Sequence, residues 1–591
     1  MVPCAELDGM SMMLTLENAA EGKQHRKREH RYREKALSWF FRNLPVLSFG
    51  VLLFVARYAL ADQFGLYEDD LSRIPGAMAE SLGNILRHLQ YWVFHFRGQG
   101  RPLHEAFILL FGYLGGRFSS LQVLYLLGFL LAWLNAALLY RLIRSAASDA
   151  FAYILVFGWI LFLADTTHVF LTHALGVQPA FTLYLLAALA LLRDKPFLGY
   201  ALGALSLITY ETFFLLLLPI PLLLQPISLK KWKLYLRHVI VLGAILVADF
   251  ALRIYVGESR IAGLGLRQLL ITPLDHSLRG PLYGLSAYVY RPIEVLQGFS
   301  PTQGLQLVVL SGGYFLVLSL LFSHTFPQAF EETFVVLDAP FRWKRVREEW
   351  YLLLLGFAFL VLAYPLTFTV DPANLTGRAS RVHLAGAFGA AMVFAGCLLL
   401  FIRRYSRGAY RHGVLGVISV WLSLLTLFSI SVQTEYARAW ALQRRFWSSL
   451  VYQIQDVGEG DVLLVDPGGL IDTAQIGANT WNVPRVLPQL FTFPETWVYP
   501  PMAYRVIGGA WEEILGEGTS ITLNRQVILT PNDTLHPADA DDVKVFSSEN
   551  GFLHRMDYRP GQGYTSSELD MEQALPPFTT TLLFRLMVLD E

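Results

Sequence analysis

Cysteine is scarce in this 591-residue chain, which has only Cys4 and Cys397. Cys4 lies in a polar N-terminal segment and Cys397 in an apolar stretch, so we expect neither a disulfide between them nor a thiolate metal site. The sequence also lacks a glycine-rich loop followed by Lys-Ser or Lys-Thr, which excludes a P-loop nucleotide site. His104-Glu105 has no second histidine at zinc-helix spacing, so the sequence carries no metalloprotease signal.

Charged residues are also few. They make up 16% of the chain, and 47 Lys and Arg balance 47 Asp and Glu. Zero net charge gives no support to a nucleic-acid partner. Hydrophobic residues, in contrast, make up 54% of the chain and aromatic residues 14%. This composition exceeds what a soluble protein needs and predicts a polytopic α-helical membrane protein.

Apolar segments within residues 41–432 predict about 11 transmembrane helices. The basic loops between them should face the cytoplasm, as should a basic tail at residues 1–40. Acidic and polar outer loops are expected at 62–119 and 254–304. We therefore expect a multi-pass protein of the plasma (inner) membrane with a cytoplasmic N-terminus.

The apolar region 197–225 is long enough for one helix, but a single span would put the basic residues at its two ends on opposite sides of the membrane. A hairpin bent at Tyr210-Glu211-Thr212 keeps both ends inside. Each arm would then be short, so we expect the bend and Glu211 to face a water-filled cavity rather than lipid.

No membrane-length apolar segment follows residue 432. Short apolar runs at 461–466, 526–530 and 543–546 alternate with Pro, Gly, Asp and Asn, which is typical of buried strands. A helix is expected at 435–455. Residues 433–591 are therefore predicted to form a small extracytoplasmic α/β domain.

Three adjacent acids, Glu68, Asp69 and Asp70, follow the first predicted span. Like charges repel one another and are costly to desolvate, so such a run is expected at a polar membrane boundary, where it binds a ligand or acts as a base. Asp70 alone has a second explanation, because it could cap a helix beginning at Leu71. Arg378 and Arg381 likewise could bind a phosphate or simply anchor at lipid headgroups.

Taken together, these features resemble the GT-C superfamily of multi-pass glycosyltransferases, which use polyprenyl- or dolichyl-phosphate-linked sugars, and within it the GtrII-like bacterial glucosyltransferases. The resemblance rests on the acidic run with Arg73 close behind it, an amphipathic stretch, and the Gly100-Arg101-Pro102 turn. It also rests on Tyr210-Glu211 at a helix bend, on Arg378 and Arg381 in the last outer loop, and on a polar C-terminal domain.

The resemblance implies an inverting transfer of a sugar from a polyprenyl-phosphate donor to a hydroxyl of a glycan, lipid or protein acceptor. Asp69 or Asp70 would be the catalytic base, and the other would orient it or hold a divalent cation, Mg²⁺ or Mn²⁺. Arg378 and Arg381 would bind the donor phosphate. The residues expected to contact substrate are Glu68, Arg73, Arg101, Glu211, Arg378, Arg381 and His383.

The sequence is also compatible with two other functions. A transporter or flippase for a lipid-linked glycan would need polar groups deeper in the spans and paired, broken-helix halves. A non-catalytic subunit of a membrane assembly would use the aromatic-rich surface for packing.

Overall fold

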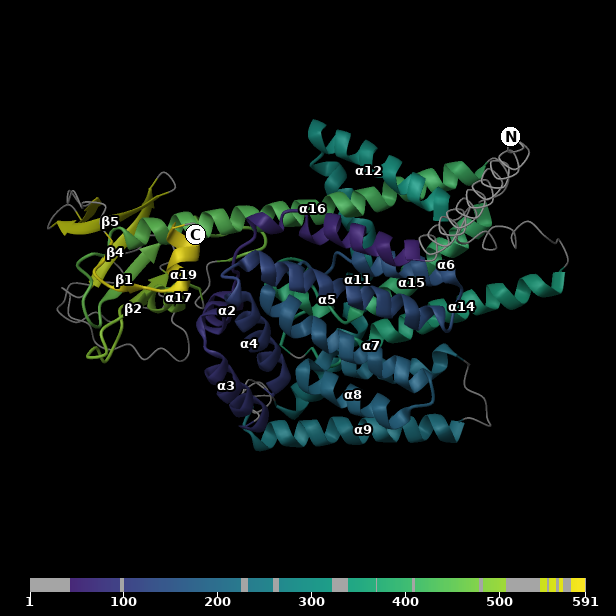
Figure 1. Cartoon of the computed structure of the whole chain (residues 1–591). Coiled ribbons are helices and arrows are strands. Elements are labelled where there is room, and N and C mark those ends of the chain that lie inside the picture. Colours follow the sequence, from purple (N-terminus) through teal and green to yellow (C-terminus); the bar gives the residue numbers. More distant parts are fainter. Residues whose placement is uncertain are drawn as a thin grey trace, which may run out of the picture.

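The structure is a computed structural model that describes residues 43–95, 100–224, 232–258, 265–321, 339–367, 369–405, 410–477, 482–505, 543–549, 552–559, 563–566 and 575–589. Helices pack side by side into a bundle, and a small β-sheet lies beyond one end of it (Figure 1). We call these parts the bundle and the sheet region. The basic N-terminal tail and the predicted strand at 526–530 lie outside the described residues.

Six helices of the described residues are long and apolar enough to cross a membrane. They are Asn43–Gln63, which includes η1 (Phe54–Tyr58) and η2 (Ala61–Gln63), α5 (Leu121–Arg144), His173–Leu192, which comprises η4 (His173–Val177) and α7 (Gln178–Leu192), α9 (Trp232–Tyr255), α12 (Pro301–Leu320) and α16 (Tyr410–Val451). Shorter apolar helices are α6 (Asp149–Ile160), α8 (Pro196–Thr209), the second half of α14 (Ala339–Leu362) and most of α15 (Gly386–Tyr405). The helical, membrane-spanning character predicted from the sequence is therefore present, whereas the count of about 11 spans stays a prediction.

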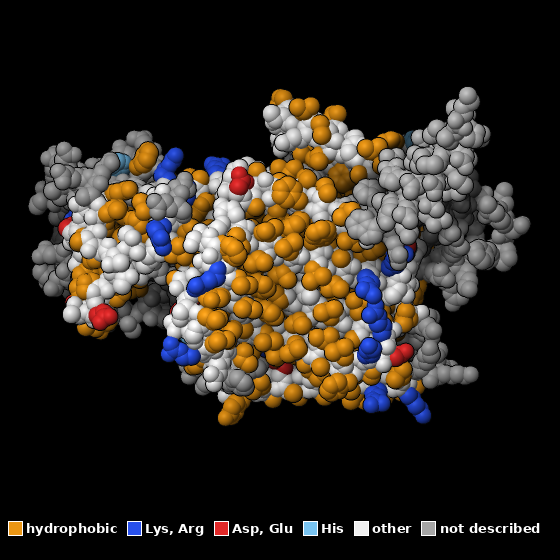
Figure 2. All heavy atoms as spheres, in the orientation of Figure 1, with side chains coloured by type: hydrophobic (Ala, Val, Ile, Leu, Met, Phe, Trp, Pro, Cys, Tyr) orange, Lys and Arg blue, Asp and Glu red, His pale blue; other side chains and the backbone are white. Residues whose placement is uncertain are grey.

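The outer surface of the bundle is apolar. Figure 2 shows hydrophobic side chains across the middle of one face, with Lys and Arg at both edges of this apolar band and a row of them along the edge far from the sheet region. On α9, Ile240 and Val247 expose 60% and 68% of their surface. An apolar band bordered by basic residues is what a helix bundle presents to a lipid bilayer.

The predicted hairpin bend at Tyr210 is present. Helix α8 ends at Thr209, Tyr210 has an extended backbone, and the chain returns through the 3₁₀ helices η5 (Glu211–Leu217) and η6 (Ile220–Leu223). Gly203 faces Leu217 so closely that a Cβ atom at position 203 would lie 2.7 Å from it. The two arms therefore pack tightly, and Glu211 lies at the tip of the bend.

The expected outer loops are largely helical. Helices α2 (Asp69–Ala79), α3 (Leu82–His95) and α4 (Pro102–Arg117) fill the first of them and lie at the end of the bundle next to the sheet (Figure 1). The second contains α11 (Leu266–Gln297). Leu274, Leu278 and Leu282 of α11 are exposed, with polar residues between them, so the segment does not have the continuous apolar sequence of a span.

The sheet region contains a five-stranded sheet with strand order β3-β1-β4-β5-β6. Strand β1 pairs in parallel with β3 and β4, and β4, β5 and β6 pair antiparallel. The strands are β1 (Val462–Asp466), β3 (Met502–Arg505), β4 (Val543–Glu549), β5 (Phe552–Arg559) and β6 (Gly563–Ser566). The remaining elements are α17 (Asn482–Leu490), the paired β2 (Phe491–Thr492) and β7 (Thr579–Thr580), α19 (Leu582–Phe584) and η10 (Arg585–Leu589).

Two of the predicted strands, at 461–466 and 543–546, are thus strands in the structure. The helix expected at 435–455 is the last part of α16, which runs without a break from the bundle to the sheet region (Figure 1). At about 1.5 Å per residue, its 42 residues span about 63 Å, roughly twice the hydrocarbon core of a bilayer. That the sheet region is a separate extracytoplasmic domain stays a prediction.

Candidate functional site

The acidic run opens helix α2. Glu68 precedes the helix with φ +50°, a backbone conformation that residues other than glycine seldom adopt. Asp69 and Asp70 form the first turn of the helix. The Asp69 and Asp70 side chains have different surroundings. Asp70 is fully buried, whereas the Asp69 side chain keeps 23% of its surface exposed.

Asp70 is held by backbone amides. Its carboxylate accepts hydrogen bonds from the backbone N–H groups of Tyr67, Leu171 and Thr172, at 3.3, 3.0 and 2.8 Å. Burial raises the pKa of Asp70 to about 7, despite these hydrogen bonds. Because both of its oxygens are occupied by backbone donors, Asp70 is placed to fix α2 against the segment at 171–172 rather than to meet a substrate.

Asp69 instead meets the arginine segment near residue 380. Arg378 Nη2 donates to Asp69 Oδ2 at 2.9 Å, and Arg378 Nη1 lies 3.9 Å from Glu68 Oε2. Arg378 begins the 3₁₀ helix η8 (Arg378–His383). The acids near residue 70 and the cations near residue 380, more than 300 positions apart in sequence, therefore lie in one place.

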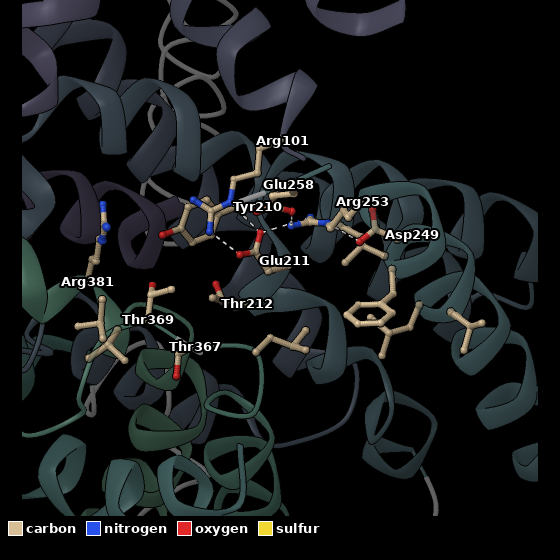
Figure 3. Close-up of a pocket in the computed structure, with 17 residues that line it drawn as sticks. Arg101, Tyr210, Glu211, Thr212, Asp249, Arg253, Glu258, Thr367, Thr369 and Arg381 are labelled. Atoms are coloured by element: carbon tan, nitrogen blue, oxygen red, sulfur yellow. Dashed lines mark hydrogen bonds and ion pairs between the residues drawn. The ribbon is translucent and has the colours of Figure 1, made fainter. Parts of the chain in front are cut away.

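A cavity of about 440 Å³ reaches helix η8 at Arg381, three residues after Arg378 (Figure 3). Its polar part is lined by Arg101, Tyr210, Glu211, Thr367, Thr369 and Arg381. Its apolar part runs between α8 and α9 and is lined by Leu207, Leu246, Val247 and Phe250. The cavity thus joins a charged end to an apolar arm beside α9, a candidate span with an exposed apolar face.

Glu211 lies at the centre of a buried charge network in this cavity (Figure 3). Arg101 Nε donates to Glu211 Oε2 at 2.8 Å, and Arg253 Nη2 lies 3.5 Å from the same oxygen. Arg253 also binds Asp249 at 2.8 Å and lies 3.3 Å from Glu258. Although burial lowers the pKa of Arg101, the adjacent Glu211 carboxylate raises it above its ordinary value.

This network predicts a large structural role for Glu211. We expect Glu211→Gln to lower the free energy of unfolding by about 3 kcal/mol, because it leaves Arg101 and Arg253 buried with less compensating charge. Chemical denaturation in detergent measures the effect. Asp149→Asn is the matched control, since the Arg144–Asp149 pair has side chains 53% and 40% exposed and should contribute about 1 kcal/mol at most. Equal losses in the two variants would contradict the prediction.

Three arginines line the cavity, and Arg381 is the one for which the described residues supply no acidic partner. Its guanidinium makes no hydrogen bond or ion pair with any described residue, whereas Arg101 and Arg253 are both paired. Burial lowers the pKa of Arg381, and the charges of Arg378 and Arg101 lower it further, while Tyr210 and Asp69 act in the opposite direction. A desolvated guanidinium of this kind is stabilised by an anion that enters the cavity.

Two of the expected substrate contacts lie elsewhere. Arg73 forms an ion pair with Glu105, which also lies 3.5 Å from His104 Nδ1. His383 is fully buried, and its Nδ1 lies 2.8 Å from the Tyr364 hydroxyl. Burial lowers the pKa of His383 to about 4, so it is neutral in this position.

Sequence reasoning did not select Asp249, Arg253 or Glu258. The signal was available, because Asp249 and Arg253 are charged residues four positions apart near the end of a predicted span. Ionisable residues at such positions seldom face lipid and mark functional or paired sites. Glu211, which pairs with Arg253, is about 40 residues away in sequence, so the network itself needed the three-dimensional structure.

The acids do not form a ready cation site. Among the described residues, no three His, Cys, Asp or Glu side chains are grouped as metal ligands. A divalent cation shared by Asp69 and Asp70 would have to displace Arg378 from one and backbone amides from the other. The residues present therefore do not fit the divalent cation that the sequence resemblance implied.

Comparisons with protein families, with curated proteins and with solved structures find no significant match to this chain. The GT-C resemblance therefore stays a prediction that depends on the sequence motifs alone.

Proposed function

We propose that this protein is a membrane glycosyltransferase that moves a sugar from a polyprenyl-phosphate donor to an acceptor hydroxyl. The observation that carries the proposal is Arg381, a partly buried guanidinium that makes no ion pair with a described residue and lines a cavity with an apolar arm. A lipid phosphate has the two chemical parts that this cavity matches: an anionic head for Arg381 and a hydrocarbon chain for the arm between α8 and α9.

Helix η8 joins the anion site to the proposed base. Arg378 at its first residue binds Asp69, and Arg381 lines the cavity one turn later. A phosphate at Arg381 would therefore lie close to the carboxylate of Asp69. This is the arrangement that an attacking hydroxyl and a leaving phosphate require on either side of an anomeric carbon.

In the proposed step, the acceptor oxygen attacks the anomeric carbon and its proton passes to the Asp69 carboxylate. The bond between the anomeric carbon and the phosphate oxygen breaks, and its electron pair stays on the lipid phosphate. Arg381 stabilises the charge that develops there. Attack on the side opposite the phosphate inverts the anomeric configuration. Asp70 keeps the start of α2 in place and does not react.

The proposal includes the sidedness expected from the sequence. The site lies at the end of the bundle that carries the sheet region, and the row of Lys and Arg along the edge of the apolar band lies at the other end (Figure 2). Basic ends face the cytoplasm in the plasma membrane. We therefore place the reaction on the extracytoplasmic side, where the acceptor is a glycan, a lipid or a protein.

One observation favours a second candidate, a transporter or flippase for a lipid-linked glycan. Asp249 lies in the candidate span α9, and its Oδ1 is buried without a hydrogen-bond partner among the described residues. Acids within a span are typical of ion and proton pathways, and the ion pair of Asp249 with Arg253 uses its other oxygen, Oδ2. In that case activity would depend on Asp249, and the sugar would stay on its lipid.

The test uses the full chain purified in nanodiscs with a polyprenyl-phosphate hexose and a panel of acceptors. The transferase proposal expects free polyprenyl phosphate to appear together with a glycosylated acceptor. Movement of the intact lipid across the bilayer without release of phosphate would instead support the flippase. Polyprenyl phosphate should also stabilise the protein against heat more than polyprenol does, and equal stabilisation by the two would overturn the assignment of Arg381 to a phosphate.

A further inference from the structure

The loop that follows strand β1 contacts the bundle at the arginine helix. Gln475, in this loop, is 5% exposed, and its side-chain oxygen accepts two hydrogen bonds from bundle residues. Thr166 Oγ1 donates one at 2.8 Å, and the backbone N–H of Gly377 donates the other at 3.0 Å. A residue of the sheet region thus binds the residue immediately before Arg378.

Gly377 has a backbone conformation that depends on this contact. Its φ is +61°, which favours glycine, and a Cβ atom there would lie 2.9 Å from the carbonyl oxygen of Gln475. The close approach of the two backbones determines how the chain enters η8. It therefore determines the direction in which Arg378 and Arg381 leave that helix.

Ser380 and Thr166 complete the contact from the bundle side. Thr166 N donates to Ser380 Oγ at 2.9 Å, and Ser380 Oγ donates to Gly377 O at 2.7 Å. Thr166 and Ser380 are almost fully buried, at 1% and 0% exposure. The side-chain oxygen of Gln475 therefore belongs to a closed hydrogen-bond network around the first turn of η8, and loss of one member leaves buried donors unsatisfied.

The turn that presents Gln475 is itself fixed. Thr473 N donates to Ile476 O at 2.7 Å, and Ile476 N donates to Thr473 Oγ1 at 3.1 Å. Ile476 and Ile471 are buried at 1% and 2% exposure, so the loop is anchored on both sides of Gln475. The sheet region thus offers a rigid acceptor to η8 rather than a mobile one.

We propose that Gln475 is a positioning residue through which the sheet region holds η8, so that Arg378 meets Asp69 and Arg381 is placed for phosphate binding. This inference rests on the proposed function, because it assigns the phosphate to Arg381. It gives the sheet region a defined role at the site: the region supplies no reacting group, but it holds the backbone that carries Arg378 and Arg381.

The experiment compares Gln475→Met, which keeps the volume but removes the acceptor, with Gln475→Glu, which keeps an acceptor oxygen for both donors. Gln122→Met, at an exposed position on α5, is the matched control. Two quantities are measured on the full chain: the affinity for polyprenyl phosphate, and amide hydrogen exchange of residues 377–383. The Met variant should bind about tenfold more weakly and exchange faster at Gly377.

In Gln475→Glu, the affinity for polyprenyl phosphate and the amide exchange of residues 377–383 should be close to those of the wild type. Gln122→Met should match the wild type in both. In the transfer assay, the loss in the Met variant should appear mainly as a higher KM for the donor. The proposal would be overturned if amide exchange at η8 in Gln475→Met were the same as in the wild type. It would also be overturned if exchange became faster while the affinity for polyprenyl phosphate did not fall. If the wild type binds no polyprenyl phosphate, the proposed function fails, and the exchange data still decide whether Gln475 holds η8.

Discussion

Asp69→Asn should lower kcat for sugar transfer by about 100- to 10,000-fold, because the amide cannot accept the proton of the attacking hydroxyl. The amide can still accept a hydrogen bond from Arg378, so the position of η8 should change little. The effect should therefore fall on kcat and leave the KM for the donor nearly unchanged. Initial rates of polyprenyl phosphate release with purified protein measure both constants.

Asp62→Asn is the matched control for this variant. Asp62 is an exposed acid in η2, at the same end of the bundle, and we expect its replacement to leave transfer unchanged. A merely structural role for Asp69, in which it only holds Arg378, would give a different result. In that case Asp69→Asn would raise the KM and leave kcat intact, which would remove Asp69 as the base.

Arg381→Met should have two opposite effects. It removes the charge-assisted hydrogen bonds to the donor phosphate, each worth about 1.5–3 kcal/mol, so binding of polyprenyl phosphate should weaken by roughly 100-fold. The ligand-free protein should become more stable, because a partly buried charge without an ion pair to a described residue is replaced by an apolar side chain. Calorimetric titration and thermal unfolding without ligand measure the two effects.

Arg381→Lys separates charge from geometry. Lysine keeps the charge but lacks the planar guanidinium, which can donate two parallel hydrogen bonds. The affinity of Arg381→Lys for polyprenyl phosphate should therefore lie between those of the wild type and Arg381→Met. Arg438→Gln is the control, since the Arg438 side chain is 69% exposed and lies on the surface of α16. If Arg381→Met lowered the stability of the ligand-free protein, an unrecognised structural partner would explain Arg381 better than an absent anion.

The sequence predicted those parts of the site that depend on local hydropathy and charge. Apolar length predicted helices that could cross a membrane, and six of the described helices could do so. The need to keep basic loops on one side gave the bend at Tyr210, which the structure has. The same reasoning brought Asp69 and Arg378 to one end of the bundle, and they form an ion pair there. The reaction assigned to them stays a prediction.

Other parts of the site depend on information that a linear pattern does not hold. Asp69 and Asp70 are identical side chains in one turn, and only packing shows that Asp70 faces the amides of 171–172 while Asp69 faces Arg378. Gln475 carries no sequence signal, because its importance comes from a backbone contact across 98 positions. The sequence placed residues 254–304 between two spans but did not predict that helix α11 forms there.

The unbroken path of α16 makes the sheet region and the bundle rotate together. Each residue of an α-helix advances the chain by about 1.5 Å and turns it by about 100°. Inserting one residue into the part of α16 between bundle and sheet would therefore swing the sheet around the helix axis and carry Gln475 away from Gly377. An insertion near a whole turn would restore the angle, but it would still move the sheet by about 5.4 Å along the axis, so the length of this helix is fixed by both angular phase and distance.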